Sequence, residues 1–271
     1  MRKIAPNVYT EISGRGCNFS WVVTKEGVVI IDTPTVPSDA IKWHDEISKS
    51  GPIRYVINTE PHMDHFAGNS FMGGTLIAHD GVREAILKAP MEQLQDMIKR
   101  FAPESPPPEK DFRFRPPDIT YSQSLTLYLG EHTFKLIHMP GHTPFQSVVF
   151  VPEERVVFTS DNVVHRVHPY LHQSLPHDWL KTLKKMQEFE ADVFVPGHGD
   201  ITDKNGLKEM NTLIQAWIDA AQKAIDEGIP LEEAKKKITM VGHFPYLTRD
   251  ARTEMIEGMS ITRLYEVLQK K

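Results

Sequence analysis

The sequence has almost no cysteine, no long apolar run and no excess of basic charge. Its one cysteine, Cys17, cannot form a disulfide within the chain, which fits a reducing compartment and predicts a cytoplasmic protein. No apolar run approaches the ~20 residues that span a bilayer. The first residues, MRKIAP, are not followed by the apolar core of a signal peptide. We therefore expect neither a membrane protein nor an exported one.

The charge balance argues against a nucleic-acid partner. The 271 residues include 31 Lys and Arg against 36 Asp and Glu, for a formal net charge of -5. Proteins that bind nucleic acid usually show a basic excess or a basic stripe, and neither is present here. The expected partner is a small-molecule substrate, with no nucleic acid and no membrane, and a homo-oligomer remains open.

The pattern of apolar residues predicts one layered α/β domain over residues 1–271. Hydrophobic residues make up 40% and charged residues 25% of the chain, which is ordinary for a globular protein and excludes a disordered one. Strand-like runs in the ranges 8–31, 53–58 and 119–158 are separated by helical patterns, and residues 204–271 are helical almost throughout. We interpret this last range as a helical C-terminal tail of the same domain.

One segment, residues 88–118, interrupts this alternation. It begins with apolar residues at helical spacing and continues into a proline-rich stretch that excludes helix and central strand. Apolar residues at that spacing are usually core, but long irregular insertions often cover functional sites. The segment is therefore expected to be an insertion that forms a lid.

The sequence is rich in histidine, with 13 residues, and its clearest motif contains two of them. The motif TEPHMDH, residues 59–65, directly follows the strand predicted at 53–58, and its ligand-type side chains include His62, Asp64 and His65. Loops at strand ends are where rigid sheets present functional groups. Imidazole together with carboxylate suits zinc, iron or manganese, so the motif predicts a metal site.

Three later segments each place a histidine or an aspartate just after an apolar strand. They are MPGHT, which contains His142, TSDN, which contains Asp161, and VPGHG, which contains His198. Because these strand ends can meet at one edge of the sheets, the side chains are expected to converge with those of the 59–65 motif.

In this order the motifs resemble those of the metallo-β-lactamase fold superfamily. That family has an Asp after an early strand, the motif H-x-H-x-D-H, a histidine in a G-H-T context, a bridging Asp and a final G-H-G. Here the corresponding residues are Asp32, Glu60, His62, Asp64, His65, His142, Asp161 and His198. The resemblance covers nearly the whole chain, and it implies a four-layer αββα sandwich with a dinuclear metal site between two sheets.

The resemblance also assigns roles to these residues. Metal site one would hold Glu60, His62 and His142, metal site two would hold Asp64, His65 and His198, and Asp161 would bridge the two. Asp32 would support the ligand loop by hydrogen bonding, as outer partners of metal ligands do. The implied cofactor is two divalent metal ions, with zinc expected and iron or manganese as alternatives.

Glu60 departs from the family pattern, which has histidine at this position. The following Pro61 favours an extended backbone at Glu60, and a site of two histidines and one glutamate is a known zinc arrangement. Two divalent ions bring +4 and the carboxylates of Glu60, Asp64 and Asp161 bring -3, so a bridging hydroxide would leave the site neutral. The usual set would leave +1. Site one is therefore expected to be a weaker Lewis acid, which makes iron or manganese more plausible, and loss of site one remains an alternative.

By resemblance, the chain is expected to be a metal-dependent hydrolase. A metal-bound hydroxide, oriented by Asp64 and Asp161, would attack the carbonyl of an ester, lactone, thioester or amide. Three histidines follow Asp161 in the range 164–173, and we choose His168 over His165 and His172 as the one that contacts substrate or donates a proton. The alternatives are a mononuclear iron oxidoreductase of the sulfur dioxygenase type and a non-catalytic metal-binding protein.

Overall fold

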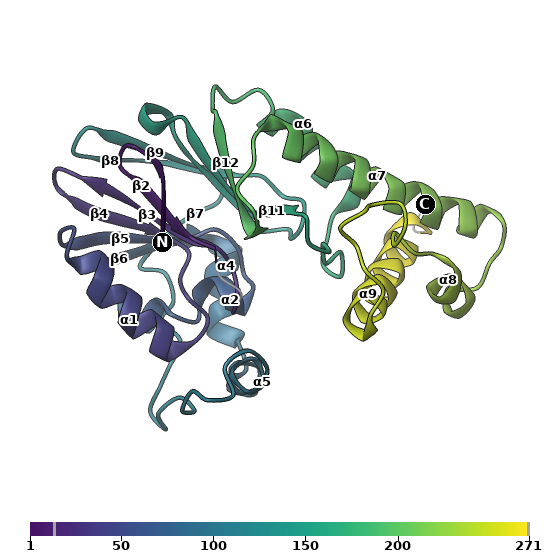
Figure 1. Ribbon diagram of the computed structural model, residues 1–271, viewed down its shortest axis with the longest axis horizontal. Helices are drawn as coiled ribbons and strands as arrows, with labels where there is room; N and C mark the ends of the chain where they lie inside the picture. Colours follow the sequence, from purple (N-terminus) through teal and green to yellow (C-terminus); the bar gives the residue numbers. More distant parts are fainter. Residues whose placement is uncertain (13–14, 270–271) are drawn as a thin grey trace.

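Two β-sheets lie face to face in the computed structural model, which describes residues 1–12 and 15–269 (Figure 1). The first sheet has the spatial order β1 (Arg2–Ala5), β2 (Val8–Glu11), β3 (Phe19–Thr24), β4 (Gly27–Ile31), β5 (Ile53–Asn58), β6 (Thr75–His79) and β7 (Ile119–Tyr121). The second has the order β12 (Val193–Gly199), β11 (Val156–His165), β10 (Ser147–Val151), β9 (His132–His138) and β8 (Ser124–Leu129). The pairs from β4 to β7 and the pair β11–β12 are parallel, and the others are antiparallel.

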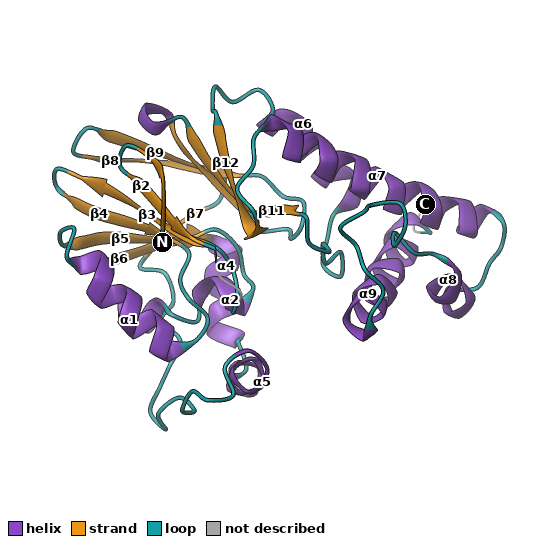
Figure 2. Cartoon of the chain, in the orientation of Figure 1, coloured by secondary structure: helices purple, strands orange, loops and turns teal. Residues whose placement is uncertain are grey.

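Helices flank both sheets (Figure 2). Those near the first sheet are α1 (Pro37–Ser48), α2 (Met63–Phe66), α3 (Asn69–Met72), α4 (Asp80–Lys88) and α5 (Met91–Phe101). Those that follow the second sheet's strands are α6 (Pro176–Met186), α7 (Lys204–Asp226), α8 (Leu231–Lys237) and α9 (Ala251–Leu268), and a short 3-10 turn covers Pro152–Glu154. Within the described residues, no helix combines the length and the apolar character that crossing a membrane requires.

The alternation of side chains along the strands explains the layers. In β4, Val29 and Ile31 enter the core between the sheets, whereas Val28 and Ile30 enter a separate core against α1. All five residues of β4 are buried, as expected for a strand that is covered on both faces.

The second sheet has the same construction on its other side. In β10, Val149 enters the core between the sheets, and Phe150 enters the core that the sheet shares with α6, α7 and α9. Trp179 of α6 and Trp217 of α7 are fully buried in this outer core. The molecule is therefore the predicted αββα sandwich, and the C-terminal helices belong to its outermost layer.

The segment 88–118 packs beside the ligand motif. Its helix α5 buries Leu94 and Ile98 in a cluster that also contains Met63 and Phe66 of α2. Residues 102–118 then form a long loop without regular structure (Figure 2). The contact with α2 puts the segment next to the predicted metal ligands, and its action as a lid stays a prediction.

Candidate metal centre

The ligand loop leaves β5 and closes into the single turn of α2. His62 has an extended backbone (φ -75°, ψ 143°) at the start of this helix, and Asp64 and His65 lie within it. The backbone oxygen of His65 accepts hydrogen bonds from the Thr33 N–H (3.0 Å) and from Asn58 Nδ2 (3.1 Å). These bonds fix the turn against the ends of two strands, so the ligand side chains start from a rigid base.

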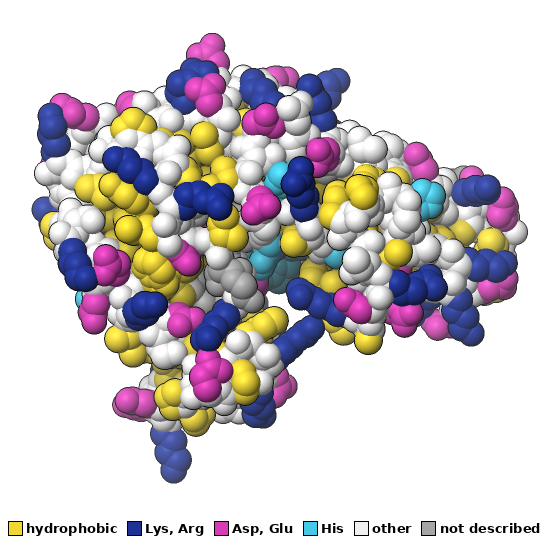
Figure 3. Space-filling model, in the orientation of Figure 1, with side chains coloured by type: hydrophobic (Ala, Val, Ile, Leu, Met, Phe, Trp, Pro, Cys, Tyr) yellow, Lys and Arg dark blue, Asp and Glu magenta, His cyan; other side chains and the backbone are white. Residues whose placement is uncertain are grey.

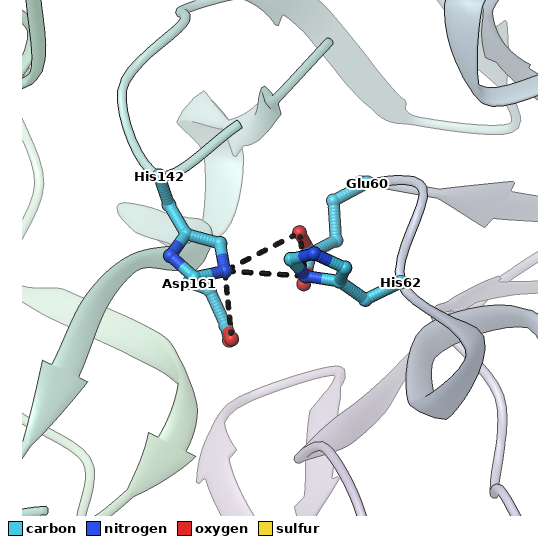
Figure 4. Close-up of side chains that lie close together, drawn as sticks. All are labelled: Glu60, His62, His142 and Asp161. Carbon is cyan, nitrogen blue, oxygen red and sulfur yellow. Dashed lines mark hydrogen bonds and ion pairs between the residues drawn. The ribbon is translucent and has the colours of Figure 1, made fainter. Parts of the chain in front are cut away.

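Four side chains from three parts of the chain form the first half of the site. The ligand-type atoms of Glu60, His62, His142 and Asp161 all lie within 4.8 Å of one another, and the side chains point toward a common centre (Figure 4). His142 Nε2 lies 3.2 Å from His62 Nδ1, 3.8 Å from Glu60 Oε2 and 3.6 Å from Asp161 Oδ2. Four ligands about 2.0–2.1 Å from one zinc ion lie about 3.3 Å from one another, so these separations suit a bound metal.

The second half of the site adjoins the first through Asp161. His198 Nε2 lies 3.1 Å from Asp64 Oδ2 and 3.4 Å from Asp161 Oδ2. His65 Nε2 lies 3.4 Å from Asp161 Oδ1. One carboxylate thus faces histidines of both halves, which is the geometry of a bridging ligand.

Glu60 also faces both halves. Its Oε2 lies 3.0 Å from His62 Nδ1, and its Oε1 lies 2.8 Å from His65 Nε2. The side chain is fully buried. Glu60 therefore points into the centre of the cluster rather than into solvent.

A local irregularity in β11 aims Asp161 into the site. The parallel pairing of β11 with β12 shifts register on both sides of Ser160, whose φ is 50°. Such bulges redirect side chains next to functional sites. Gly197 of β12 makes room, because a Cβ at this position would lie 1.8 Å from Asp161 Oδ1. The glycine before His198 in the G-H-G motif is thus required by the approach of the bridging carboxylate.

Asp32 supports the ligand loop from behind, as the sequence predicts. Its Oδ1 accepts from the Thr59 N–H (2.8 Å), and its Oδ2 accepts from Thr59 Oγ1 (2.6 Å) and lies 2.9 Å from His65 Nδ1. A proton on His65 Nδ1 donates to this carboxylate and leaves Nε2 free for a metal. Burial raises the pKa of the neighbouring Cys17 to about 12, so its thiol stays protonated.

Gln146 is a site residue that the sequence did not suggest. With its amide oriented to suit its neighbours, it donates to Glu60 Oε2 (3.2 Å) and accepts from Ser160 Oγ (2.8 Å) and the Asp161 N–H (3.0 Å). It is fully buried and thus links Glu60 to the strand segment that carries Asp161. The signal available was only a polar residue at the start of an apolar strand.

The electrostatics of the cluster suit a cation. Burial acts to raise the pKa of Asp161, but His198 and His65 outweigh it and hold that pKa well below its usual range. Burial likewise acts to lower the pKa of His62 and of His198, yet Glu60 and Asp161 raise these values to about 9 and about 10. His65 also has a pKa well above its ordinary value. Protonated histidines thus supply the positive charge that metal ions would otherwise bring.

Buried atoms that make no hydrogen bond give a further test of the fit to metals. Glu60 Oε1, His65 Nε2 and Asp161 Oδ1 are buried and make no hydrogen bond among the described residues, although the histidine nitrogen lies 2.8 Å and 3.4 Å from the two carboxylate oxygens as an ion-pair partner. Buried polar atoms normally make hydrogen bonds, so donor atoms that only face one another suit a shared cation. Figure 3 shows histidine side chains within a hollow of the surface, between the sheet region and the C-terminal helices. The donor set and its access both fit divalent metal ions.

Comparison with known proteins shows the family of the chain. The profile of the family described as "Metallo-beta-lactamase superfamily" matches residues 12–198, which contain every predicted ligand. The chain belongs to this superfamily. A linear primary-alkylsulfatase of Pseudomonas sp. (strain ATCC 19151) is 24% identical over 82% of the chain and 50% of its own length.

Solved structures share the fold of this superfamily member. The sec-alkyl sulfatase PisA1 has a TM-score of 0.71 at 14% identity, covering 97% of this chain and 49% of that one. A metallo-beta-lactamase from Pontibacter korlensis has a TM-score of 0.60 at 20% identity, covering 79% of this chain and 97% of that one. The chain spans about half the length of the two alkylsulfatases.

The structure brings all seven predicted ligands together, but it places the predicted proton donor elsewhere. His168 Nε2 lies 3.4 Å from Glu257 Oε1 of α9, and its ring lies near Trp217. His172, four residues later, stacks on the ring of His62 with centroids 5.2 Å apart. His165 Nε2 lies 3.6 Å from Glu209 Oε2, away from the cluster. His172 is therefore the histidine that the structure adds to the site.

Zinc binding is expected to release protons. At pH 7 the metal-free protein carries protons on His62, His65 and His198, because their pKa values are raised, whereas ligation needs neutral imidazole. Zinc loading should therefore release protons, and zinc affinity should rise with pH. Isothermal titration calorimetry in Tris and in Pipes, two buffers with different heats of ionisation, measures the release from the difference in heat. Equal heats after correction for the metal–buffer interactions would contradict the assigned protonation.

The same shifts predict how the metal-free fold responds to alkali. A histidine whose folded pKa is raised stabilises the fold fully below its unfolded pKa of 6.5 and loses that contribution as the pH rises through the folded value. The metal-free protein should therefore lose stability between about pH 7 and pH 10, as denaturant titrations at each pH would measure. The Asp161→Asn variant, which lacks the bridging charge, should lose less over that range.

Proposed function

We propose that this chain is a dinuclear metal-dependent hydrolase that cleaves an ester, lactone, thioester or amide bond of a small molecule. Membership of the superfamily supports a metal-dependent hydrolase in general. The observation that carries the finer proposal is the convergence of seven donor side chains in two halves that share Asp161. Asp64 and His198 have side chains that are 20% and 28% exposed, so the site is open to a substrate on this side.

The metal ions, when bound by these residues, would lower the pKa of water and polarise the substrate carbonyl. The carboxylates of Asp64 and Asp161 then have a separate task. Both have a lowered pKa despite burial, because His198 and His65 stabilise their charged forms, so both accept hydrogen bonds at neutral pH. They orient the attacking water toward the open side of the site.

His172 takes the place beside the substrate that we predicted for His168. Burial and the nearby His62 and His142 lower the pKa of His172 to about 4, so it is neutral at pH 7. A neutral imidazole is a hydrogen-bond donor rather than a strong acid. We therefore assign His172 to positioning the substrate, not to protonating the leaving group.

One observation favours a second candidate, the hydrolysis of a sulfate ester. The alkylsulfatase relative matches 82% of the chain, whereas three lactamase-like relatives match 26% to 40% of it. A sulfate ester and a carboxylic ester place similar demands on a pair of metal ions, namely an activated water and a stabilised oxyanion.

Metal content and a substrate panel test the proposal together. Protein purified without chelator, or reconstituted with zinc, manganese or iron, should carry close to two metal ions per chain by elemental analysis, because two sets of ligands are present. It should hydrolyse either carboxylic and thioesters or alkyl sulfates, as followed by acid release at constant pH. One iron per chain with oxygen consumption would replace the proposal by an oxidoreductase, and no turnover with any metal would favour a binding protein.

A further inference from the structure

A pocket of about 320 Å³ lies beside the metal centre. Pro61, which directly follows Glu60, forms part of its wall, and His172, which stacks on His62, forms another part. The remaining wall is largely apolar and includes Phe145 and Ala85 of α4. A substrate whose reacting bond sits at the metal centre would extend into this pocket.

The pocket also contains one cationic side chain from the C-terminal layer. Among its described lining residues, Arg263 of α9 is the one arginine, and the lining includes no lysine, aspartate or glutamate. The Arg263 Nε donates to the Ser174 backbone oxygen (2.9 Å), and its Nη1 lies 3.3 Å from Glu266 Oε2. Its Nη2 makes no hydrogen bond to the part of the chain that the structure describes. One edge of a fixed guanidinium is thus available to a ligand.

The apolar wall opposite is held in place. The Phe145 ring stacks on His79 with centroids 5.6 Å apart and an interplanar angle of 22°. Gly81, at the start of α4, permits this position, because a Cβ there would lie 2.2 Å from Phe145. Phe145 nevertheless stays 39% exposed and lines the pocket. A ring held so firmly and left exposed suits contact with an apolar ligand group.

The His172 imidazole forms the part of the pocket wall that lies next to the metal centre, because its ring stacks on that of His62. The pocket thus combines a guanidinium group and an apolar ring around one space beside the metal centre.

We propose that this pocket selects substrates in which an oxyanion, a carboxylate or a sulfate, is joined to a short apolar chain, and that Arg263 binds the oxyanion. A guanidinium N–H group donates charge-assisted hydrogen bonds to such oxyanions, and the N–H groups of Arg263 Nη2 are available for this task. Arg263 lies outside the range 12–198 that the superfamily profile matches, so this selectivity would belong to the C-terminal layer. The inference rests on the proposed function only for the position of the reacting bond.

Binding of matched probes to the zinc-loaded full chain tests the proposal without requiring turnover. Octanoate and octanamide have the same shape and differ in charge, so calorimetry should show octanoate binding at least tenfold more tightly. The Arg263→Gln variant should lose the preference for octanoate and keep its affinity for octanamide. The Arg263→Lys variant should keep part of the preference, because lysine retains the positive charge but not the guanidinium geometry. Arg252→Gln, an exposed change on the same helix, is the matched control for net charge and should behave like the parent.

The length of the ligand's alkyl chain and the chemistry of its head group test the two other parts of the proposal, the apolar chain and the kind of oxyanion. Affinity should rise about threefold to fourfold per added methylene from butanoate to octanoate, until the pocket is full. In the Phe145→Ala variant, the affinity should rise less with each added methylene. Octane-1-sulfonate, which carries a sulfur oxyanion but no ester bond to hydrolyse, identifies the preferred head group: binding tighter than octanoate favours a sulfate, and weaker binding favours a carboxylate.

Several results would overturn the proposal. If Arg263→Gln still prefers octanoate, the carboxylate binds the metal ions instead of Arg263. If the variant loses octanoate and octanamide alike, Arg263 only supports the loop that carries Ser174. Failure of the hydrolase proposal is distinct, because it appears as missing turnover while the Arg263-dependent preference for octanoate remains.

Discussion

Replacement of Asp161 by alanine is expected to abolish hydrolysis and to weaken the binding of both metal ions. The carboxylate lies within 3.6 Å of ligand nitrogens of His65, His142 and His198, so its removal takes one ligand from each half. Loss of an outer partner of a metal ligand costs about 10–100-fold in affinity or activity. Loss of the proposed shared ligand itself should cost more than loss of an outer partner, so the activity should fall below about one-hundredth of the parent value.

The variant needs a control for folding and a metal titration. Asp200→Ala removes an exposed carboxylate just beyond the end of β12 and should keep parental activity and metal content. Elemental analysis and zinc titration of the two variants then separate loss of metal from loss of fold, which thermal unfolding monitors. An Asp161→Ala protein that keeps two metal ions, or activity within tenfold of the parent, would show that Asp161 is not the bridge.

The convergence of the proposed ligands was predictable from the sequence because their positions follow from strand ends. Strands that run parallel in a covered sheet deliver their following loops to one edge, so an apolar run followed by histidine or aspartate is informative. The motif at 59–65 follows β5 in this way, and His142 follows β9 within a short loop. Asp161 and His198 instead lie inside β11 and β12, where the irregular pairing around Ser160 turns the strands toward the site.

The choice between His168 and His172 was beyond the sequence. Both lie in one irregular loop, and no periodicity distinguishes them. The distinction comes from Glu257 of α9, almost ninety residues later in the chain, which pairs with His168. Glu257 is itself held in place, because it accepts hydrogen bonds from Thr239 Oγ1 (3.0 Å) and the Met240 N–H (2.8 Å). Once His168 is held there, His172 is left beside His62. The roles of Gln146 and Arg263 depend on equally distant packing.

The other large expected effect concerns Glu60, the one departure from the family motif. Glu60→His should rebuild the usual set of three histidines in the first half and raise the charge of the site by one. Zinc affinity of that half should rise by about tenfold, while manganese affinity should fall, because imidazole suits zinc and carboxylate suits manganese. Glu60→Gln keeps an oxygen donor but loses the charge, so it should weaken the binding of both metals.

Because Glu60 faces both halves of the site, its replacement changes the charge at both. Its two oxygens lie 3.0 Å from His62 Nδ1 and 2.8 Å from His65 Nε2, so the loss of its charge is felt in both halves. With less anionic charge to offset the metals, the alkaline-rising limb of the pH–rate profile should move to lower pH in Glu60→His.

Replacement of Glu60 by histidine should also remove the hydrogen bond that Gln146 donates to Glu60 Oε2 in the parent. Gln146→Ala should consequently weaken metal binding in the parent and have little further effect in Glu60→His. Identical zinc titrations and pH–rate curves for the parent, Glu60→His and Glu60→Gln would mean that the site is built without Glu60.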